Sequence, residues 1–344
     1  MLKALSVAAA LALWAGAAAA SEPLPETREY TLDLPADLAP VWCGERLYLF
    51  SSRGRTQMLG TGDEAPNCNP VPIAPALQPV CGPEGAMAIG RDGELWRLGK
   101  GFPATVQSGL KGALALWPLP AGVAVLFGDR LLLPGGQASP LPFEASGGNA
   151  LPGGGFWVRD GRQAARLDAA GRVLWTWTPR RGAPGPATVS AGALYAGTTR
   201  GELVALDDRR GRVRYRYRGG GEALSPPHAA GDRVLWASSD HFVRCLHGPS
   251  GSLIWQFRAA GRPAFGPFAI EAGLLFAEAA GNRLFVLGLR DGRKLWDWKV
   301  PKGNILTSPS VSAGRAAVLA WAEEATPVLY VVPLPPAGAG AAAK

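Results

Sequence analysis

The stretch LHGPSGSLIWQF, residues 246–257, has the pattern of two short strands joined by a turn at Gly251. Trp255 follows the glycine after four residues, and Phe257 follows two residues later. Residues i and i+2 of a β-strand lie on the same face, so the second strand presents two aromatic rings to one side. The stretch therefore predicts a β-hairpin that buries an aromatic pair.

The same pattern occurs four times at a nearly constant spacing. The other copies are LDAAGRVLWTW (167–177), LDDRRGRVRYRY (206–217) and LGLRDGRKLWDW (287–298). The turn glycines and the large aromatic residues four positions after them are expected to dock each repeat against its neighbour. They are Gly171, Gly211, Gly251 and Gly292, with Trp175, Tyr215, Trp255 and Trp296. A repeat of about 40 residues built from short strands is typical of a β-propeller blade.

Weaker copies of the repeat fill the N-terminal half, and each repeat is expected to contain four strands. The last repeat has only three strands of its own, and REYTLDL (28–34) is expected to supply the fourth and to leave no open sheet edge. The predicted fold is all-β, an eight-bladed β-propeller of four-stranded antiparallel blades whose ring is closed by an N-terminal strand. First strands are expected near residues 41, 80, 115, 149, 187, 228, 267 and 309.

Both ends of the chain are predicted to lie outside the propeller. Residues 1–20 have a basic start, an apolar stretch and a small-residue cleavage site, which together indicate a secretory signal peptide. A retained anchor is the alternative, but the apolar run is short for a membrane-spanning helix. The propeller is expected to occupy 21–334 as a single domain, followed by a disordered tail, 335–344. The predicted location is periplasmic or secreted, with no lipobox cysteine.

The spacing of the four cysteines fits neither a redox motif nor a haem-attachment motif. Cys43, Cys68, Cys81 and Cys245 form no CxxC or CxxCH motif. One disulfide bond is expected among the three N-terminal cysteines, and the sequence leaves the pairing open. Cys245 lies in an apolar strand and is predicted to be a small buried residue.

The glycine turn with its following tryptophan resembles the docking motif A-x-D-x-x-T-G-x-x-x-W of the PQQ-repeat propellers, the quinoprotein alcohol dehydrogenase-like family. Residues 205–215 come close to this motif, and the resemblance is good over about 165–332 and looser over 40–165. It implies an eight-bladed propeller. The motif's threonine is replaced in the four copies by Ala170, Arg210, Ser250 and Asp291.

The resemblance also implies one of two kinds of function. The dehydrogenases of the family hold PQQ and Ca²⁺ beneath an adjacent pair of cysteines, and this sequence has no adjacent cysteines. The binding members are closer in size, above all the propeller subunit of the outer-membrane β-barrel assembly machinery, a periplasmic scaffold. We therefore expect a non-catalytic scaffold without a cofactor that binds protein partners in the cell envelope. The alternatives are a PQQ-dependent oxidoreductase and a carbohydrate- or peptide-binding sensor domain.

Few residues indicate catalysis or metal binding. The motifs GxSxG and HExxH and the P-loop are absent from the sequence. His228, Asp240 and His241 are expected on one face of the sixth repeat, which makes them candidates for a metal or ligand site. Two histidines in loops also meet by chance, and their spacing is not diagnostic of a metal.

The segment 209–220 alternates arginines with Val213, Tyr215 and Tyr217. This alternation predicts an outer strand whose apolar residues pack against a neighbouring blade and whose arginines are exposed on the rim. A solvated strand is the simplest interpretation. The alternative is a rim that binds an acidic partner or an anionic membrane surface. Nucleic acid is not expected as a partner, and the protein is expected to be a monomer. The rim arginines are Arg212, Arg214, Arg216 and Arg218.

Overall fold

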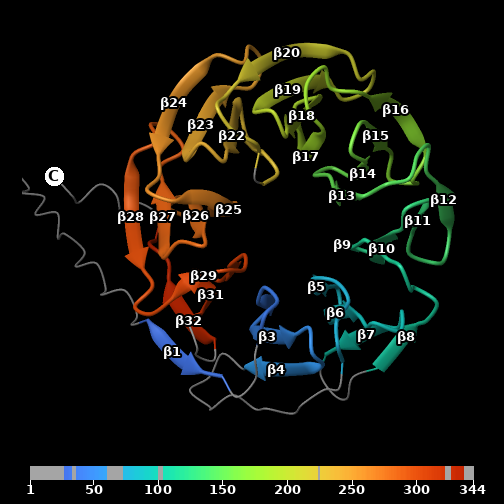
Figure 1. The fold of residues 1–344 in the computed structure, drawn as a ribbon, viewed down its shortest axis with the longest axis vertical. Coiled ribbons are helices and arrows are strands. Elements are labelled where there is room, and N and C mark those ends of the chain that lie inside the picture. Colours follow the sequence, from blue (N-terminus) through green and yellow to red (C-terminus); the bar gives the residue numbers. More distant parts are fainter. Residues whose placement is uncertain are drawn as a thin grey trace, which may run out of the picture.

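The computed structural model describes residues 27–32, 36–59, 73–99, 104–223, 225–321 and 327–336. These residues form β-strands arranged in eight sheets, which Figure 1 shows as blades around a central axis. The predicted all-β, eight-bladed propeller is confirmed. Within the described ranges no helix is long and apolar enough to cross a membrane. The expected signal peptide and Cys68 lie outside the described residues, as does most of the expected tail.

The second to seventh blades each contain four consecutive antiparallel strands, and the first strand of each lies nearest the axis (Figure 1). The second to fourth blades comprise β5 (Val80–Gly82), β6 (Gly85–Ile89), β7 (Leu95–Leu98), β8 (Ala104–Gln107), β9 (Ala115–Leu119), β10 (Gly122–Leu126), β11 (Arg130–Leu132), β12 (Ala138–Pro140), β13 (Gly147–Ala150), β14 (Phe156–Arg159), β15 (Ala164–Leu167) and β16 (Val173–Trp177). The fifth to seventh comprise β17 (Pro184–Ser190), β18 (Ala193–Thr198), β19 (Glu202–Asp207), β20 (Val213–Arg218), β21 (His228–Ala230), β22 (Arg233–Ala237), β23 (Phe242–His247), β24 (Leu253–Arg258), β25 (Arg262–Ile270), β26 (Gly273–Ala279), β27 (Arg283–Leu287) and β28 (Lys294–Lys299).

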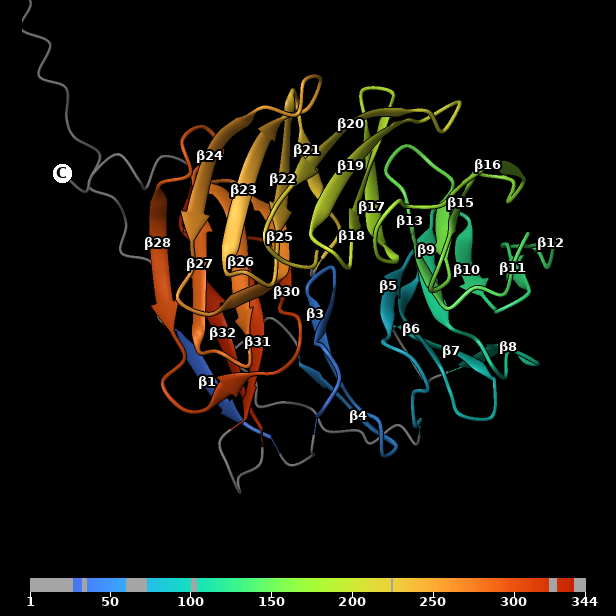
Figure 2. The same ribbon diagram turned by 45° about the horizontal axis from the view of Figure 1, so that its top comes forward.

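The two ends of the chain meet in the last blade and close the ring. Strand β1 (Arg28–Thr31) pairs antiparallel with the last strand, with Arg28 opposite Val331, and Figure 2 shows the two side by side. The predicted closure by an N-terminal strand is confirmed. The described strands of the first blade are β2 (Val41–Cys43), β3 (Arg46–Ser51) and β4 (Arg55–Leu59). The last blade also contains β29 (Asn304–Ile305), β30 (Ser310–Ser312), β31 (Arg315–Trp321) and β32 (Val328–Pro333).

The hydrophobic core consists of layers between neighbouring blades. Because each blade lies between two others, both faces of its central strands are covered, and these strands are apolar without alternation. In β22, the consecutive residues Val234, Leu235 and Trp236 are all fully buried. Leu235 packs toward the seventh blade, whereas Val234 and Trp236 pack toward the fifth.

An irregularity in register recurs at the start of the outer strand in the fourth to seventh blades. In β20, Val213 lies opposite Leu206 and Tyr215 lies opposite Ala205, so Arg214 is an extra residue that forms a β-bulge. Val213 and Tyr215 therefore face opposite sides of the blade. The prediction that Val213 packs on the same side as the two tyrosines is wrong, because strict alternation does not hold across a bulge.

Candidate functional site

The ring of Trp255 in the sixth blade covers the turn glycine of the seventh. A Cβ atom at Gly292 would lie 2.5 Å from the indole ring, and Trp255 is 9% exposed. Its Nε1 donates a hydrogen bond to the carbonyl of Leu289 in the same turn, at 3.1 Å. Gly292 has a φ of +70°, so this position requires glycine both for its backbone conformation and for the close approach of the ring.

The same contact joins the fourth blade to the fifth and the fifth to the sixth. Trp175 covers Gly211, and Tyr215 covers Gly251; a Cβ atom would lie 2.7 and 2.5 Å from the respective rings. Nε1 of Trp175 donates to the carbonyl of Asp208 at 2.8 Å. The hydroxyl of Tyr215 is buried with no hydrogen-bond partner among the described residues, and burial raises the pKa of this phenol well above its ordinary value.

Two of the eight predicted docking positions, Gly171 and Trp296, do not form this contact between an aromatic ring and a turn glycine. Gly171 is approached by Ser139 of the third blade, whose hydroxyl donates to the carbonyl of Ala170 at 3.2 Å. Trp296 is partly buried and packs against the layer between the seventh and eighth blades. In the eighth blade the third and fourth strands, β32 and β1, come from opposite ends of the chain, so no turn joins them there.

A buried ion pair, which was not predicted from the sequence, also joins the fourth and fifth blades. Arg166 is 6% exposed, and its Nε donates to Oδ1 of Asp208 at 2.8 Å. Asp208 thus accepts hydrogen bonds from two side chains of the fourth blade, Arg166 and Trp175, which lie opposite each other in the sheet. The sequence feature that could have predicted this ion pair is the arginine within the apolar strand AARL (164–167), because a charge buried in such a strand needs a partner of opposite charge.

The arginines of β20 have unequal surroundings. Arg212 and Arg218 are exposed, and Arg214 pairs with Asp207 at 2.9 Å. Arg216 is only partly exposed, and its buried Nε has no acceptor among the described residues. It lies opposite Val204, which packs against tryptophans of the fourth blade. The expectation that all four arginines are exposed is therefore wrong for Arg216, because each face of a blade is directed toward a neighbouring blade.

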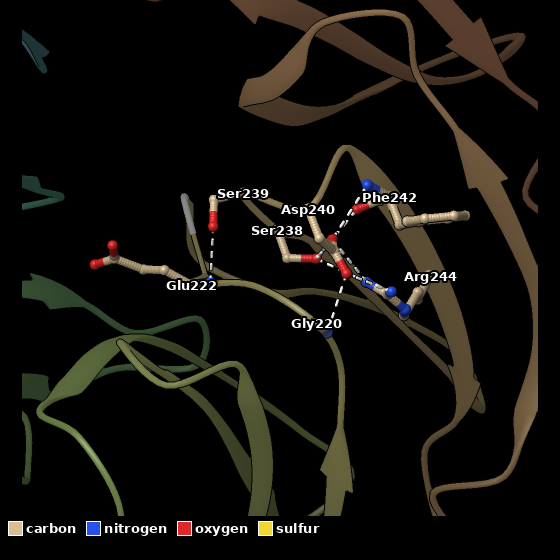
Figure 3. A network of polar contacts seen from close by, with 7 residues as sticks. All are labelled: Gly220, Glu222, Ser238, Ser239, Asp240, Phe242 and Arg244. Atoms are coloured by element: carbon tan, nitrogen blue, oxygen red, sulfur yellow. Dashed lines mark hydrogen bonds and ion pairs between the residues drawn. The ribbon is translucent and has the colours of Figure 1, made fainter.

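The metal-site candidates of the sixth blade are engaged in other contacts. Figure 3 shows the carboxylate of Asp240 facing Arg244, with Nη2–Oδ2 and Nη1–Oδ1 distances of 2.6 and 3.1 Å. The same carboxylate accepts from the Ser238 hydroxyl at 2.6 Å and from the Gly220 N–H at 3.0 Å. Burial raises the pKa of Asp240, but the hydrogen bonds from Arg244 and Ser238 outweigh it and bring the pKa to about 2.

The two histidines do not join Asp240. Nδ1 of His241 faces the carbonyl of Ala260 at 3.3 Å, and burial lowers the pKa of His228. Across the described part of the chain, no three His, Cys, Asp or Glu side chains are gathered as a metal site. Asp240 instead accepts a hydrogen bond from the N–H of Gly220 and so connects the linker that follows the fifth blade to the sixth blade.

A disulfide bond joins the first two blades. It links Cys43 in β2 to Cys81 in β5, with a Cα–Cα distance of 5.3 Å, and thus identifies the pair that the sequence left open. Cys245 is a buried free thiol, as predicted, and burial raises its pKa to about 11. The covalent bond reinforces the ring near its closure.

Sequence comparison relates the C-terminal half to one family. The profile of the PQQ_2 family, described as "Outer membrane protein assembly factor BamB", matches residues 160–325. BamB of Nitrosomonas eutropha is 28% identical over 152 residues, which are 43% of this chain and 37% of the relative. BamB of Salmonella typhimurium is 26% identical over 186 residues, 50% of this chain and 45% of the relative. The matched regions thus span less than half the length of these relatives.

Structural comparison extends over nearly the whole chain. The crystal structure of BamB from Moraxella catarrhalis has a TM-score of 0.62 at 18% identity, covering 90% of this chain and 97% of that one. The computationally designed protein Ika8 has a TM-score of 0.68 at 13% identity, covering 86% and 95%. At such identities, the likeness shows the fold alone. The repeat motif, the eight-bladed ring and the sequence matches together show that the chain is similar to BamB and to the PQQ-repeat β-propellers.

Proposed function

We propose that the protein is a non-catalytic scaffold of the bacterial cell envelope that binds protein partners during outer-membrane protein assembly. The observation that supports this role is the match of residues 160–325 to the assembly-factor profile. The same residues contain the blades that are joined by the aromatic, glycine and ion-pair contacts. We place the protein in the periplasm, with residues 1–20 as its signal peptide and 21–334 as the propeller.

The contacts between blades suit a rigid binding platform. The linker between the fifth and sixth blades is held by Asp240 at Gly220 and by the Ser239 hydroxyl, which accepts from the N–H of Glu222 at 2.9 Å. Figure 3 shows the Glu222 side chain pointing away from this network, and the residue is exposed. Backbone that is already held, as at Gly220 and Glu222, loses less conformational entropy on binding. We therefore propose that the face of the ring with the interblade linkers binds the partner.

The buried polar side chains support a structural rather than a catalytic role. Arg166 faces the carboxylate of Asp208 in the next blade at 2.8 Å, and Arg244 faces that of Asp240 within the sixth blade at 2.6 Å. Charged side chains that are paired with each other in this way are not available for proton transfer or nucleophilic attack on a substrate. We accordingly propose no enzymatic activity and no cofactor for this chain.

The test is removal of the gene from the bacterium that encodes it, followed by quantification of proteins in the isolated outer membrane. We expect lower levels of β-barrel proteins, restored by the wild-type gene. Crosslinking in intact cells should also capture envelope proteins with the propeller. Unchanged outer-membrane protein levels together with no crosslinked envelope partner would contradict the proposal. So would alcohol oxidation by the purified protein after addition of PQQ and Ca²⁺.

Two charge reversals test which face binds. Glu222→Lys alters the linker face, whereas the exposed Glu271 lies in the turn between β25 and β26, on the opposite face. We expect Glu222→Lys to weaken crosslinking to the partner and Glu271→Lys to leave it unchanged. The reverse result would place the partner on the opposite face.

A further inference from the structure

We propose that the gap between the fourth and fifth blades at the outer rim binds a phosphate group. A hollow of about 500 Å³ lies there, lined by four arginines and one glutamate, which leave a net charge of +3. This site is independent of the scaffold role, since it requires no protein partner. The lining residues are Arg180, Arg181, Glu202, Arg216 and Arg218.

The fold brings these residues together from two blades. Arg218 lies directly opposite Glu202 in the sheet, and Arg216 is two residues earlier on the same face. This face is directed toward the fourth blade, because Val204, opposite Arg216, belongs to the layer that contains Trp177. Arg180 and Arg181 follow β16 in the linker between the two blades, so they complete the hollow from the other side.

The arginines of the hollow are poorly neutralised. Glu202, the carboxylate among the lining residues, has a side chain that is 6% exposed, and its oxygen lies 3.6 Å from Nε of Arg218. This distance is too long for a good hydrogen bond. Nε of Arg216 is buried and reaches no acceptor among the described residues. By contrast, Arg214 in the same strand has its own carboxylate at 2.9 Å.

The chemistry of the lining favours an anion with several oxygens. Guanidinium groups are donors only, and their planar arrangement suits paired hydrogen bonds to phosphate oxygens. A phosphate monoester carries roughly −1.5 to −2 charges at neutral pH, which would offset most of the excess charge. The hollow is also large enough for the group that bears the phosphate, since ligand pockets begin at about 300 Å³. The shared chemistry fits either a soluble phosphate ester or a phospholipid headgroup.

The first experiment measures the binding of inorganic phosphate and pyrophosphate by titration calorimetry at low and high salt. We expect saturable binding that weakens with salt. Arg216→Gln/Arg218→Gln should weaken it at least about tenfold, because charge-assisted hydrogen bonds are lost. The matched control is Arg209→Gln/Arg210→Gln, which removes the same charge from two exposed turn residues outside the hollow and should change affinity less than about twofold.

Absence of saturable binding, or an equal loss in the control, would overturn the proposal. Arg180→Gln/Arg181→Gln, in the exposed linker, provides a second variant that leaves the sheet unchanged and should also weaken binding. Melting curves establish that each variant is folded. If polyglutamate binds and phosphate does not, the ligand is an acidic peptide and the phosphate site is refuted.

Vesicles distinguish the two sources of phosphate. Sedimentation with vesicles that contain phosphatidylglycerol, compared with phosphatidylcholine alone, measures headgroup binding. A lipid headgroup would be supported if the protein binds the anionic vesicles, if Arg216→Gln/Arg218→Gln abolishes this binding, and if pyrophosphate competes with it. Phosphate binding without vesicle binding would support a soluble ester. Both results are independent of outer-membrane protein levels, so a failure here leaves the scaffold proposal intact.

Discussion

Trp255 of the sixth blade lies with its ring against Gly292 of the seventh, and its indole N–H donates to the carbonyl of Leu289 in the same turn. One side chain thus provides an apolar cover and a directional hydrogen bond to the next blade. The contact recurs between Trp175 and Gly211. The stability of the blades that share this contact therefore depends on the turn of the neighbouring blade, as expected for a repeat architecture.

Substitution of the turn glycine should weaken the ring at this contact. Gly292→Ala places a methyl group 2.5 Å from the Trp255 ring at a φ of +70°, so we expect the free energy of unfolding to fall by about 3 kcal/mol. Gly231 is the matched control, with a φ of +59° and open space around its Cβ position. Gly231→Ala should cost about 1 kcal/mol. Equal losses in urea denaturation would show that the ring does not constrain the glycine.

Removal of the Tyr215 hydroxyl should not destabilise the protein. This hydroxyl is buried without a described hydrogen-bond partner, so Tyr215→Phe should leave stability unchanged or raise it by up to about 1 kcal/mol. Trp255→Phe is the contrasting variant. It loses the hydrogen bond to Leu289 and part of the ring and should cost roughly 1–3 kcal/mol. A loss above about 1 kcal/mol for Tyr215→Phe would indicate an acceptor for the hydroxyl.

The sequence was informative wherever a contact repeats along the chain. The glycines of the outer turns recur with their aromatic residues, so the blade length and the role of Trp255 in docking neighbouring blades could be expected before the structure. The number of blades could be expected from the recurring first strands. Closure by β1 could also be expected, because the last repeat contained one strand too few and REYTLDL matched no other blade.

The sequence was less informative where contacts depend on backbone geometry or on residues distant in the chain. The bulge at Arg214 reverses the face of Val213 relative to Tyr215, and no feature of the alternating pattern marks it. Arg166 and Asp208 are 42 residues apart, and only the packing of two blades brings them together. The basic hollow at Arg216 arises in the same way, since its lining belongs to two blades.

Protonation of Asp240, which pairs with Arg244, should lower the free energy of unfolding at acid pH. The pKa of Asp240 is about 2 in the folded protein, compared with an ordinary value of 3.8, so the unfolded chain binds its proton first as the pH falls. The pair therefore stabilises the fold fully above about pH 4, and this contribution of roughly 2 kcal/mol is lost between pH 4 and 2. Asp240→Asn should be less stable at pH 6 and should lose less on acidification. Parallel pH profiles of the two proteins, from urea denaturation, would contradict this assignment.

Loss of the closing strand should destabilise the last blade. Removal of residues 27–32 exposes the edge of β32 and removes the fully buried Leu32 from the layer between the eighth and first blades. An unpaired apolar edge promotes association, so we expect a lower melting temperature and soluble aggregates in size-exclusion chromatography with light scattering. The full chain, measured alongside, should be monomeric. A truncated protein that stays monomeric with unchanged melting would show that β1 is dispensable for the ring.

Removing one or both charges of the Arg166–Asp208 ion pair should reveal how the junction of the fourth and fifth blades is stabilised. Asp208→Ala leaves the guanidinium of Arg166 buried, at 6% exposure, without its carboxylate, and should cost about 3–5 kcal/mol in urea denaturation. Arg166→Met/Asp208→Ala removes both charges and should recover most of that loss, while the backbone carbonyl of residue 208 remains available to Trp175. Arg172→Ala is the exposed control, because it breaks an ion pair to Asp168 in which the arginine side chain is 81% exposed, and should cost less than about 1 kcal/mol. If the double variant is as unstable as Asp208→Ala, the unpaired charge is not the cause, and the Asp208 side chain must hold the turn through other contacts.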